Sequence, residues 1–338
     1  MEGENFLGRL KRYLISLTVL LVDDKKNWIA PAFLKALMLV RTHKIDYVVT
    51  SGPPHSSHLI GLALKKISGV KWAADFRDPW TDVLDFKPRQ ARCALSDKLD
   101  RVLEKKVILG ADKVFTTTEP LMNRYLERYK GAARKIRLLT NGFDAKRFSP
   151  DVKPRYARFT ITYAGTLYYN RTPEPLFKSI AKLVSEKKIR PNDFAIKLIG
   201  NCASVDGRPV AEIAREYGLG NAVELPGYLS QSEVLGIMRR SHLLLVLAPN
   251  QPLAVPAKVY DCIASGTDIL ALTDEGGTKD LINGIKAGCC FSHSEIDDIS
   301  RYIHESIKSR TTGVPARTEA HKQFDIRVIT RKLSEELS

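Results

Sequence analysis

FTITYAGTLYYNRTPEPLFKSI, residues 159–180, is the stretch that decides the fold of this 338-residue chain. Its first half alternates aromatic or aliphatic residues with threonine, which predicts a strand that ends at Gly165. Thr172 and Pro173 are typical of the first positions of a helix. A helix that starts just beyond the carboxyl end of a strand points unpaired N–H groups above the sheet, and Arg171 adds a permanent charge there. This layout predicts a phosphate site; an ordinary strand-to-helix connection with a surface arginine fits the segment equally well.

Strand patterns alternate with helix patterns along the whole chain, which predicts an α/β fold with parallel sheets and crossover helices. In the first half, strands are expected near 46–51, 70–76, 113–118 and 135–141, with helices near 28–42, 56–67, 94–109 and 119–129. In the second half, strands are expected near 159–164, 195–200, 222–225, 243–248 and 268–272. A polar segment with two prolines, residues 143–158, joins the two halves, and the chain is long enough for a core in each.

The composition excludes several kinds of protein. The chain has five cysteines, which are scattered and odd in number: Cys93, Cys202, Cys262, Cys289 and Cys290. Because none of them forms a Cys-x-x-Cys pair, we expect neither a disulfide framework nor a zinc site, and a reduced, cytoplasmic setting follows. The apolar run YLISLTVLLV at 13–22 is about half the ~20 residues needed to span a bilayer, and it lacks a small-residue cleavage site. We therefore expect neither a membrane span nor a signal peptide.

Positive charge is concentrated in the first half of the chain. Residues 1–150 hold 28 Lys and Arg against 16 Asp and Glu, a net +12, whereas the remaining residues hold 25 against 22, a net +3. A basic domain of this kind suits an anionic membrane surface or an acidic substrate. No recognition motif for nucleic acid accompanies the charge, and acids are interleaved with the basic residues, so nucleic acid is not expected as a partner. Plain solubility explains the charge equally well.

The second informative segment is VPAKVYDCIASGTDIL, residues 255–270. A proline precedes a short helix that carries Lys258 and Asp261 on one face, and Gly266 ends that helix. A lysine for phosphate and a carboxylate for the hydroxyl groups of a ribose would together hold a nucleotide. A solvated salt bridge between the two side chains is the alternative interpretation.

With both segments considered, the chain resembles the family 4 glycosyltransferases, which are retaining enzymes of the GT-B fold that use nucleotide-sugar donors. It is most similar to the bacterial cell-surface polysaccharide branch with the signature DFRDPW, here residues 75–80. The other matching segments occur in family order: TSGPPHSSHLIGLALKK at 50–66, LEKKVILGADKVFTTTEPL at 103–121, TNGFD at 140–144, GTLYYNR at 165–171, IGN at 199–201, GYLSQSEV at 227–234 and PAKVYDCIASG at 256–266.

The resemblance implies an α/β GT-B fold of two Rossmann-like domains that face a cleft. Residues 1–150 would form the acceptor-side domain, residues 151–320 the nucleotide-sugar domain, and residues 321–338 a C-terminal helix that packs back toward the first domain. The implied reaction is transfer of a hexosyl group, with retention at the anomeric carbon, from a nucleotide sugar to a cell-surface glycan or a lipid-linked acceptor. The implied setting is the cytoplasm, at the inner face of the cell membrane.

Site residues carry over where a motif matches. The residues implied in catalysis are Arg171, Lys258 and Arg77. The donor would be bound by Gly165, Thr166, Arg171, Gly200, Asn201, Gly227, Tyr228, Lys258 and Asp261. The acceptor side would include His55, His58, Asp75 and Asp78. Because two cations would face the diphosphate, no metal and no other cofactor is expected.

Two groups on the acceptor side keep an alternative interpretation. The charged residues of DFRDPW follow a predicted strand and would face the cleft, but an internal Asp–Arg network with Trp80 as a packing lid explains them equally well. His55 and His58 flank a helix start, and either of them would reach the acceptor; two surface histidines without a function are the alternative.

The chain departs from the family pattern in its donor motif and at its amino end. Leu253 stands where the family has a glutamate, and Asp261 is one methylene shorter than the usual glutamate, so a carboxylate contact to the donor sugar is not carried over. Residues 1–22 contain no strand followed by a glycine-rich loop, so the first domain is expected to be truncated. A non-catalytic nucleotide-sugar-binding protein is therefore the alternative function, and a nucleotide-sugar epimerase of the same fold is a third.

Overall fold

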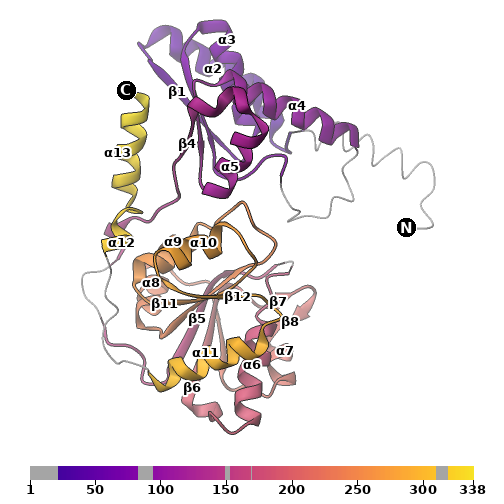
Figure 1. Cartoon of the computed structure of the whole chain (residues 1–338), viewed down its shortest axis with the longest axis vertical. Helices are drawn as coiled ribbons and strands as arrows, with labels where there is room; N and C mark the ends of the chain where they lie inside the picture. The colour runs from indigo at the N-terminus through magenta and orange to yellow at the C-terminus, as the bar shows by residue number, and fades with distance from the viewer. Residues whose placement is uncertain (1–21, 83–93, 149–152, 169, 310–318) are drawn as a thin grey trace, which may run out of the picture. The chain divides into compact units, whose positions relative to one another are not determined.

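The computed structural model of the chain divides into two compact units, which are described separately (Figure 1). The first comprises the residues up to Thr140 together with Glu335–Ser338, and the second comprises Asn141–Ser334. The structure describes residues 22–82, 94–148, 153–168, 170–309 and 319–338. Cys93, most of the apolar run at 13–22 and part of the expected linker lie outside these residues.

The first unit is built on a parallel sheet. Its described strands lie side by side in chain order: β1 (Tyr47–Gly52), β2 (Lys71–Phe76), β3 (Lys113–Thr116) and β4 (Ile136–Leu138). The helices are α2 (Ile29–Thr42), α3 (Ser56–Ser68), α4 (Ala94–Gly110) and α5 (Glu119–Arg128), with 3-10 turns η1 (Lys26–Trp28) and η3 (Lys130–Lys135). Among the described residues β1 pairs on one side only, so it is an edge strand. The end of the chain joins this unit, because Glu336 forms ion pairs with Lys113 (2.7 Å) and Arg137 (3.4 Å).

The loop that follows β2 is held by buried polar contacts. Glu104 of α4 is fully buried, and its carboxylate accepts hydrogen bonds from Thr81 N (2.8 Å) and from the Tyr129 hydroxyl (2.5 Å). Arg128 donates to Asp82 Oδ1 (2.5 Å) and to Glu104 Oε1 (3.3 Å). Because a buried carboxylate needs such partners, these contacts fix the loop after the DFRDPW signature to α4 and α5.

His55 and His58 lie in the core of the first unit. Both rings are buried, and His55 stacks on Trp80 with ring centroids 5.2 Å apart. The His58 ring lies 4.4 Å from that of Phe76, and its Nδ1 is 2.9 Å from Thr50 Oγ1. Burial lowers the pKa of His55 to about 4 and also lowers the pKa of His58. The interpretation as surface histidines is therefore wrong, and neither ring is exposed to contact an acceptor.

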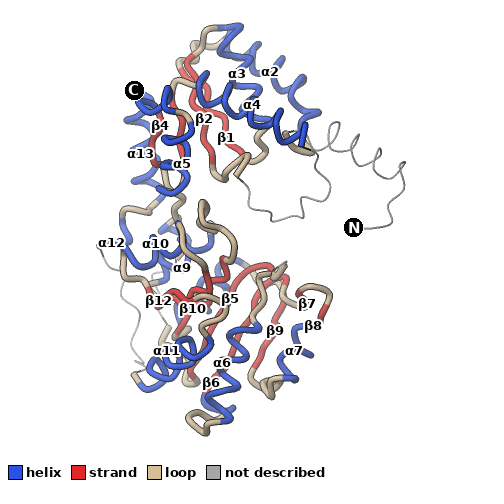
Figure 2. The backbone as a smooth tube through the Cα atoms, turned by 45° about the vertical axis from the view of Figure 1, so that its right-hand side comes forward, coloured by secondary structure: helices blue, strands red, loops and turns tan. Residues whose placement is uncertain are grey.

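The second unit is a parallel sheet with helices on both faces (Figure 2). The strands lie in the order β12 (Gly288–Phe291), β11 (Asp268–Thr273), β10 (Leu243–Ala248), β5 (Phe159–Thr166), β6 (Phe194–Asn201) and β9 (Val223–Gly227). The helices are α6 (Glu174–Ser185), α7 (Val210–Glu216), α8 (Gln231–Arg240), α9 (Lys258–Ser265), α10 (Gly277–Gly284), α11 (Ile296–Lys308), α12 (Glu319–Lys322) and α13 (Ile326–Leu337), whose residues from Glu335 on belong to the first unit. The remaining elements are the 3-10 turns η4 (Ala145–Arg147) and η5 (Pro191–Asp193) and the short hairpin of β7 (Ser204–Val205) and β8 (Arg208–Pro209).

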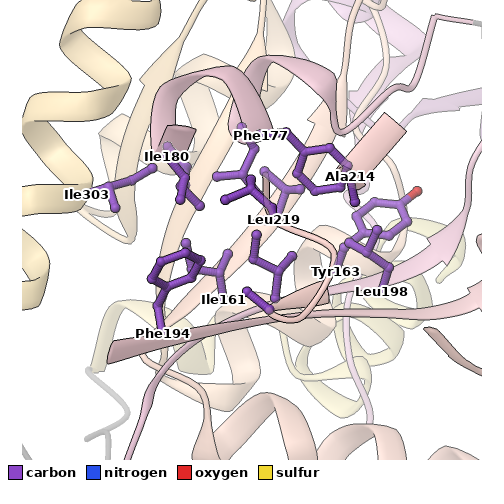
Figure 3. Packing of buried hydrophobic residues seen from close by; sticks show 14 of the residues in the cluster. Ile161, Tyr163, Phe177, Ile180, Phe194, Leu198, Ala214, Leu219 and Ile303 are labelled. Atoms are coloured by element: carbon purple, nitrogen blue, oxygen red, sulfur yellow. The ribbon is translucent and has the colours of Figure 1, made fainter. Parts of the chain in front are cut away.

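Separate apolar clusters cover the two faces of this sheet. On one face, β5 and β6 pack against α6, α7 and α11; Figure 3 shows Ile161, Phe194, Phe177, Ile180 and Leu219 in this cluster. On the other face, β10 and β11 pack against α8, α9 and α10. Central strands that are buried on both faces explain the near-continuous apolar runs of the sequence. Each large side chain buried in this way contributes about 1.5–3 kcal/mol of transfer free energy.

The expected α/β class with parallel sheets is confirmed. Every predicted strand, and every predicted helix of the first half, is present within three residues of its expected bounds, whereas the expected C-terminal helix at 321–338 is divided into α12 and α13. The strand β12 was not predicted, because its sequence, Gly-Cys-Cys-Phe, is short and has no apolar alternation. In the part of the chain that the structure describes, no helix combines the length and the apolar character needed to cross a bilayer.

Gly200 is expected to be essential for the second unit. It has a φ of 105°, and a Cβ on it would lie 2.3 Å from the carbonyl oxygen of Gly165 on the neighbouring strand. We expect Gly200→Ala to lower the free energy of unfolding by about 3 kcal/mol, because backbone strain and a backbone clash add together. Gly218→Ala is the matched control, since Gly218 has a φ of 70° with open space around the Cβ position. It should cost only about 1 kcal/mol. Urea unfolding, monitored by circular dichroism, measures the free energy of unfolding of both variants. An equal loss in Gly200→Ala and Gly218→Ala would contradict the close approach of β5 and β6.

The burial of His55 predicts a loss of stability in acid. Its folded-state pKa of about 4 lies below the ordinary value of 6.5, so the neutral ring stabilises the folded state fully above pH 6.5. This contribution, about 3 kcal/mol, is lost as the pH falls from 6.5 toward 4. All three tryptophans, Trp28, Trp72 and Trp80, lie in the first unit, so their fluorescence follows its unfolding in urea. The free energy of unfolding should depend less on pH in His55→Gln than in wild type. In His43→Gln, a change of an exposed histidine, this dependence should be unchanged. If the free energy of unfolding depended on pH as steeply in His55→Gln as in wild type, a group other than His55 would be responsible for the loss of stability.

Candidate functional site

The candidate site lies at the carboxyl edge of the sheet in the second unit. From β5 the chain crosses over to β6 on one side, whereas β10 on the other side of β5 leads to β11. The winding direction therefore changes between β5 and β10, and in open α/β sheets ligands bind in the crevice at such a point. The loop after β5 carries Arg171, and α9, the helix after β10, carries Lys258 and Asp261. The structure thus brings the two informative sequence segments to one edge.

Backbone contacts hold the ends of β5 and β6 together. Leu167 N donates to Asn201 O (2.9 Å), and Gly200 lies against the carbonyl group of Gly165. Thr166 and Asn201, the last residues of the two strands, are exposed at this rim. Because glycine has no Cβ, two backbones approach here more closely than other residues allow. The result is a rim of backbone groups and short polar side chains, which a ligand can approach closely.

Arg171 is held beside this rim by two tyrosines. Its guanidinium carbon lies 4.7 Å from the centroid of the Tyr168 ring, and its backbone N–H donates to Tyr168 O (3.0 Å). Burial raises the pKa of Tyr163, and Arg171 opposes that shift because it lies beside the Tyr163 hydroxyl. The same hydroxyl donates to Thr166 O (2.9 Å). The charge of Arg171 is therefore placed by contacts within the protein before any ligand arrives.

Lys258 begins α9 and brings a second cation to the same edge. Burial raises the pKa of the Cys202 thiol to about 11, and the nearby Lys258 ammonium opposes that shift. Cys202 Sγ also lies 3.5 Å from Gly165 O, so Lys258 and the end of β5 flank one thiol. The N-cap of α9 is Ala257, which has no side-chain acceptor for the first amides of the helix. Val259 N and Tyr260 N nevertheless already donate to Pro256 O (2.9 Å) and Ala257 O (3.2 Å), so the positive charge at this end of α9 comes mainly from Lys258.

Asp261 lies in the first turn of α9 and is half-buried. Burial raises the pKa of its carboxyl, and the cations of Arg147 and Lys258 oppose that shift. Lys258 and Asp261 form no ion pair with each other among the described residues, so the salt bridge of the alternative interpretation is not formed. A lysine and a carboxylate that do not neutralise each other can each meet a separate part of a ligand.

Arg147 is a residue that reasoning from the sequence missed. It ends η4, and this turn is fixed on α9 because Phe143 and Phe148 belong to the apolar cluster that contains Tyr260, the neighbour of Asp261. The two phenylalanine rings meet edge to face, with centroids 6.3 Å apart. The only signal in the sequence was these two large apolar residues in an otherwise polar segment.

The amino end of α6 contributes less than the sequence predicted. The helix begins at Glu174, and its N-cap is Pro173 rather than Thr172. Pro173 and Pro175 have no N–H group, and Glu174 N already donates to Thr172 Oγ1 (3.2 Å). The carboxylate of Glu174 also occupies the first turn. Positive charge for an anion therefore comes from Arg171 and Lys258, and the expected contribution of the α6 dipole is corrected accordingly.

Gly227 and Tyr228 lie at the end of β9, at the same edge of the sheet. Gly227 has a φ of 75°, and the Tyr228 side chain that follows is 80% exposed. A large aromatic ring in such a position is available to stack on a flat ligand group. The structure therefore places these residues at the same edge as the two cations.

The charged residues of DFRDPW belong to the first unit. Asp75 Oδ2 accepts a hydrogen bond from Ser51 Oγ (2.9 Å) and lies 3.7 Å from Arg77 Nη1. Burial raises the pKa of Asp75, and Arg77 opposes that shift. Trp80 is buried, so the Asp–Arg network and packing lid of the alternative interpretation are both formed. Arg77 is nevertheless half-exposed and Asp78 is exposed, so both can still meet a ligand.

A cavity of about 750 Å³ opens at the same carboxyl edge of the sheet, next to the loop that carries Arg171. It is not lined by Arg171, Lys258 or Asp261; its polar lining includes Asn170, Thr172, Glu174, Lys178, Asp206, Asp274 and His293. Three carboxylates make this cavity unfavourable for a diphosphate.

In the described ranges, no group of three or more His, Cys, Asp or Glu side chains is arranged to bind a metal ion.

The chain is similar to known proteins of one kind over most of its length. D-inositol 3-phosphate glycosyltransferase of Corynebacterium jeikeium (strain K411) is 22% identical over 202 residues, which are 56% of this chain and 47% of that protein. The protein of that name from Corynebacterium urealyticum (strain ATCC 43042 / DSM 7109) is 21% identical over 275 residues, 75% of this chain and 61% of that protein. The chain thus spans about half to three fifths of the length of these curated relatives.

Solved structures share the fold. Sucrose-phosphate synthase (tll1590) from Thermosynechococcus elongatus aligns with a TM-score of 0.65 and 17% identity, over 92% of this chain and 78% of that one. Anabaena Alr3699/HepE in complex with UDP-glucose aligns with a TM-score of 0.63 and 17% identity, over 91% and 82%. The expected GT-B class, with two Rossmann-like units, is confirmed.

A family model confirms what these likenesses indicate. It describes the glycosyl transferases group 1 and matches residues 145–323, more than half of the chain. The matched segment includes Arg147, Arg171, Lys258 and Asp261. The chain therefore belongs to the glycosyl transferases group 1 family.

Proposed function

We propose that this protein transfers a hexosyl group from a nucleotide-sugar donor to a hydroxyl of a cell-surface glycan or a lipid-linked acceptor. The observation that carries the proposal is the arrangement of Arg171, Lys258 and Asp261 at the switch point of the second sheet. Two cations suit a diphosphate, and a carboxylate suits the hydroxyl groups of a ribose. The Anabaena protein of the same fold is in complex with UDP-glucose, which supports a donor of this class.

The physical task of such a site is to stabilise a leaving nucleoside diphosphate and a cationic sugar. Arg171 and Lys258 would bind the diphosphate where negative charge grows. Because Tyr168 and Tyr163 already place Arg171, little reorganisation is needed when the bond breaks. In this proposal the side chains supply the positive charge without a metal or other cofactor.

The nucleoside would lie along the rim of the sheet toward β9. Asp261, when ionised, would accept hydrogen bonds from the ribose hydroxyl groups, and the Gly227–Tyr228 segment would meet the base. Gly165, Thr166, Gly200 and Asn201 would form the backbone floor between them. This path follows the neighbouring strands β5, β6 and β9, whose carboxyl ends lie at one edge.

The sequence motifs support the finer assignment to the retaining family 4 branch with the DFRDPW signature. In that mechanism the leaving phosphate itself would guide the acceptor hydroxyl, and no side-chain nucleophile is required. Arg77, half-exposed and 3.7 Å from Asp75, is proposed to act in catalysis. The basic first half of the chain supports a place of action in the cytoplasm, at the inner face of the membrane.

Substitution of the two cations tests the donor site. Arg171→Ala and Lys258→Ala should each weaken the binding of UDP or GDP, whichever binds the wild type, by about 10- to 100-fold. Calorimetry measures the binding, and release of nucleoside diphosphate from the matching nucleotide sugar measures turnover. Lys188→Ala, a change of an exposed lysine between α6 and β6, is the control and should leave binding unchanged. Wild-type affinity and turnover in both site variants would contradict the assignment of Arg171 and Lys258 to the donor site. Saturable binding to the wild type without transfer or hydrolysis would favour the non-catalytic alternative.

Arg147 should keep Asp261 ionised for ribose binding. Without the Arg147 charge, the pKa of Asp261 should rise further above its ordinary value, since burial already raises it. We expect nucleotide affinity in Arg147→Gln to be lost at a higher pH on acidification than in wild type, and to be several-fold weaker near neutral pH. Calorimetric titrations over a series of pH values measure both effects. Lys146→Gln, a change of the exposed neighbour, is the control. Superimposable pH profiles for Arg147→Gln and wild type would remove Arg147 from the site.

A further inference from the structure

The cavity beside the loop of Arg171 is a concave feature that the donor site leaves unused. Its volume is about 750 Å³, and none of the residues assigned to the donor lines it. Segments that are distant in sequence form its wall: the start of α6, the turn between β7 and β8, the loops after β10 and β11, and the segment before α11. Proteins bind small ligands in cavities of this size. The chemistry of the wall therefore indicates which ligand fits.

The wall of the cavity carries a net negative charge. Glu174, Asp206 and Asp274 supply three carboxylates, whereas Lys178 supplies one ammonium group. Among the described residues, Lys178 forms no ion pair with any of them. His293 adds no charge at pH 7, because burial lowers the pKa of its ring, although nearby Asp274 opposes that shift. A wall of this kind repels phosphate and carboxylate groups and attracts a cation.

The wall offers both hydrogen-bond acceptors and donors. Glu174 accepts one hydrogen bond from the Tyr217 hydroxyl (2.9 Å), and Asp274 accepts one from Asn250 N (2.9 Å). A carboxylate has about four acceptor sites, so acceptor capacity remains on both. The ammonium group of Lys178 and the side-chain amide of Asn250 are donors. A sugar hydroxyl group donates one hydrogen bond and accepts others, so this mixed wall matches it.

The wall also contains apolar surfaces and a buried polar atom without a partner. Pro175, Pro249, Ile296 and the ring of Tyr217 are part of the lining, and such groups pack against the C–H faces of a ligand ring. His293 Nε2 is buried and forms no hydrogen bond within the described structure. Because an unpaired buried polar atom is unfavourable, a ligand hydroxyl group that reaches it would stabilise the wall.

Residues with an unusual backbone conformation gather at this cavity. Asn170, Asp206 and Asn250 have φ values of 57°, 49° and 55°, and all three line the cavity. Among the described residues other than glycine, the only others with positive φ are Val22, Lys187 and Lys286. Backbone conformations of this kind occur preferentially where a protein contacts a ligand.

We propose that this cavity binds a sugar residue of a glycan and selects against acidic sugars. The carboxylates and amides meet the hydroxyl groups of the sugar, and the net negative wall excludes a uronic acid or a sugar phosphate. Asn170 lines the cavity and directly precedes Arg171, so a glycan bound here lies beside the loop of the donor site. The assignment rests on the proposed function in one respect, that the protein acts on sugars.

Saturation-transfer NMR on the full chain at pH 7 tests this assignment. The probes are the methyl α-glycosides of glucose, galactose and mannose, the corresponding amino sugars, which are cationic, and the corresponding uronic acids, which are anionic. The expected result is transfer to at least one glycoside, several-fold tighter binding of its amino sugar, and no transfer to its uronic acid at equal concentration.

Two variants locate the binding to the cavity. Asn250→Gly removes a side-chain amide but keeps the backbone conformation accessible, and it should weaken glycoside binding by at least about fivefold. Asp206→Asn removes one charge, and asparagine also tolerates a positive φ, so it should reduce mainly the preference for the amino sugar. Asn221→Gly, at the amino end of β9, and Asp280→Asn, on α10, are the matched controls and should bind all probes as wild type does.

Three outcomes would overturn the proposal. The first is absence of transfer from wild type to every glycoside and amino sugar. The second is wild-type binding of all probes in both Asn250→Gly and Asp206→Asn, because the sugar would then bind elsewhere. The third is binding of the uronic acids as tightly as the glycosides. Calorimetry with UDP or GDP separates this proposal from the donor site: nucleotide binding without sugar binding contradicts the cavity alone, and the reverse contradicts the proposed function.

Discussion

The close approach of β5 and β6 at Gly165 and Gly200 is the contact on which the candidate site depends. Gly200 has no room for a Cβ, since one would lie 2.3 Å from the Gly165 carbonyl oxygen. This approach lets Leu167 bond to Asn201 and sets the direction of the loop that carries Arg171. It also brings Cys202 to the Gly165 carbonyl, next to Lys258. Both cations of the site are thus positioned relative to one backbone contact.

The electrostatic properties of the candidate site in the second unit follow from the partial burial of its charged side chains. Asp261 is half-buried, and its ionised form is stabilised by Arg147 and Lys258 without a direct pair to Lys258. Arg171 lies against two tyrosines, one of which also supports the turn after β5. Charged groups held by packing, and not neutralised by each other, are suited to bind a ligand of the opposite charge with little rearrangement.

The first unit uses burial differently. Glu104, His55 and His58 are charged or titratable types, yet they lie in its core, where hydrogen bonds and aromatic rings surround them. They hold the loop after β2 and the start of α3, and they are not presented to a ligand. α2 shows the reverse, with large apolar side chains exposed. Polar residues inside and apolar residues outside are the two departures from ordinary burial that carry information in this unit.

The sequence by itself determined the α/β class, the bounds of the main strands and of the helices of the first half, and the two segments that meet at the site. Alternation, glycine turns and helix starts are local features, so local reasoning recovers them. Only the tertiary structure decided what those residues contact. It showed that α6 begins with prolines that lack N–H groups, that packing of Phe143 and Phe148 brings the charge of Arg147 near Asp261, and that His55 and His58 are buried. Such facts depend on residues far apart in the chain, because burial and charge pairing are set by packing and not by the neighbouring sequence.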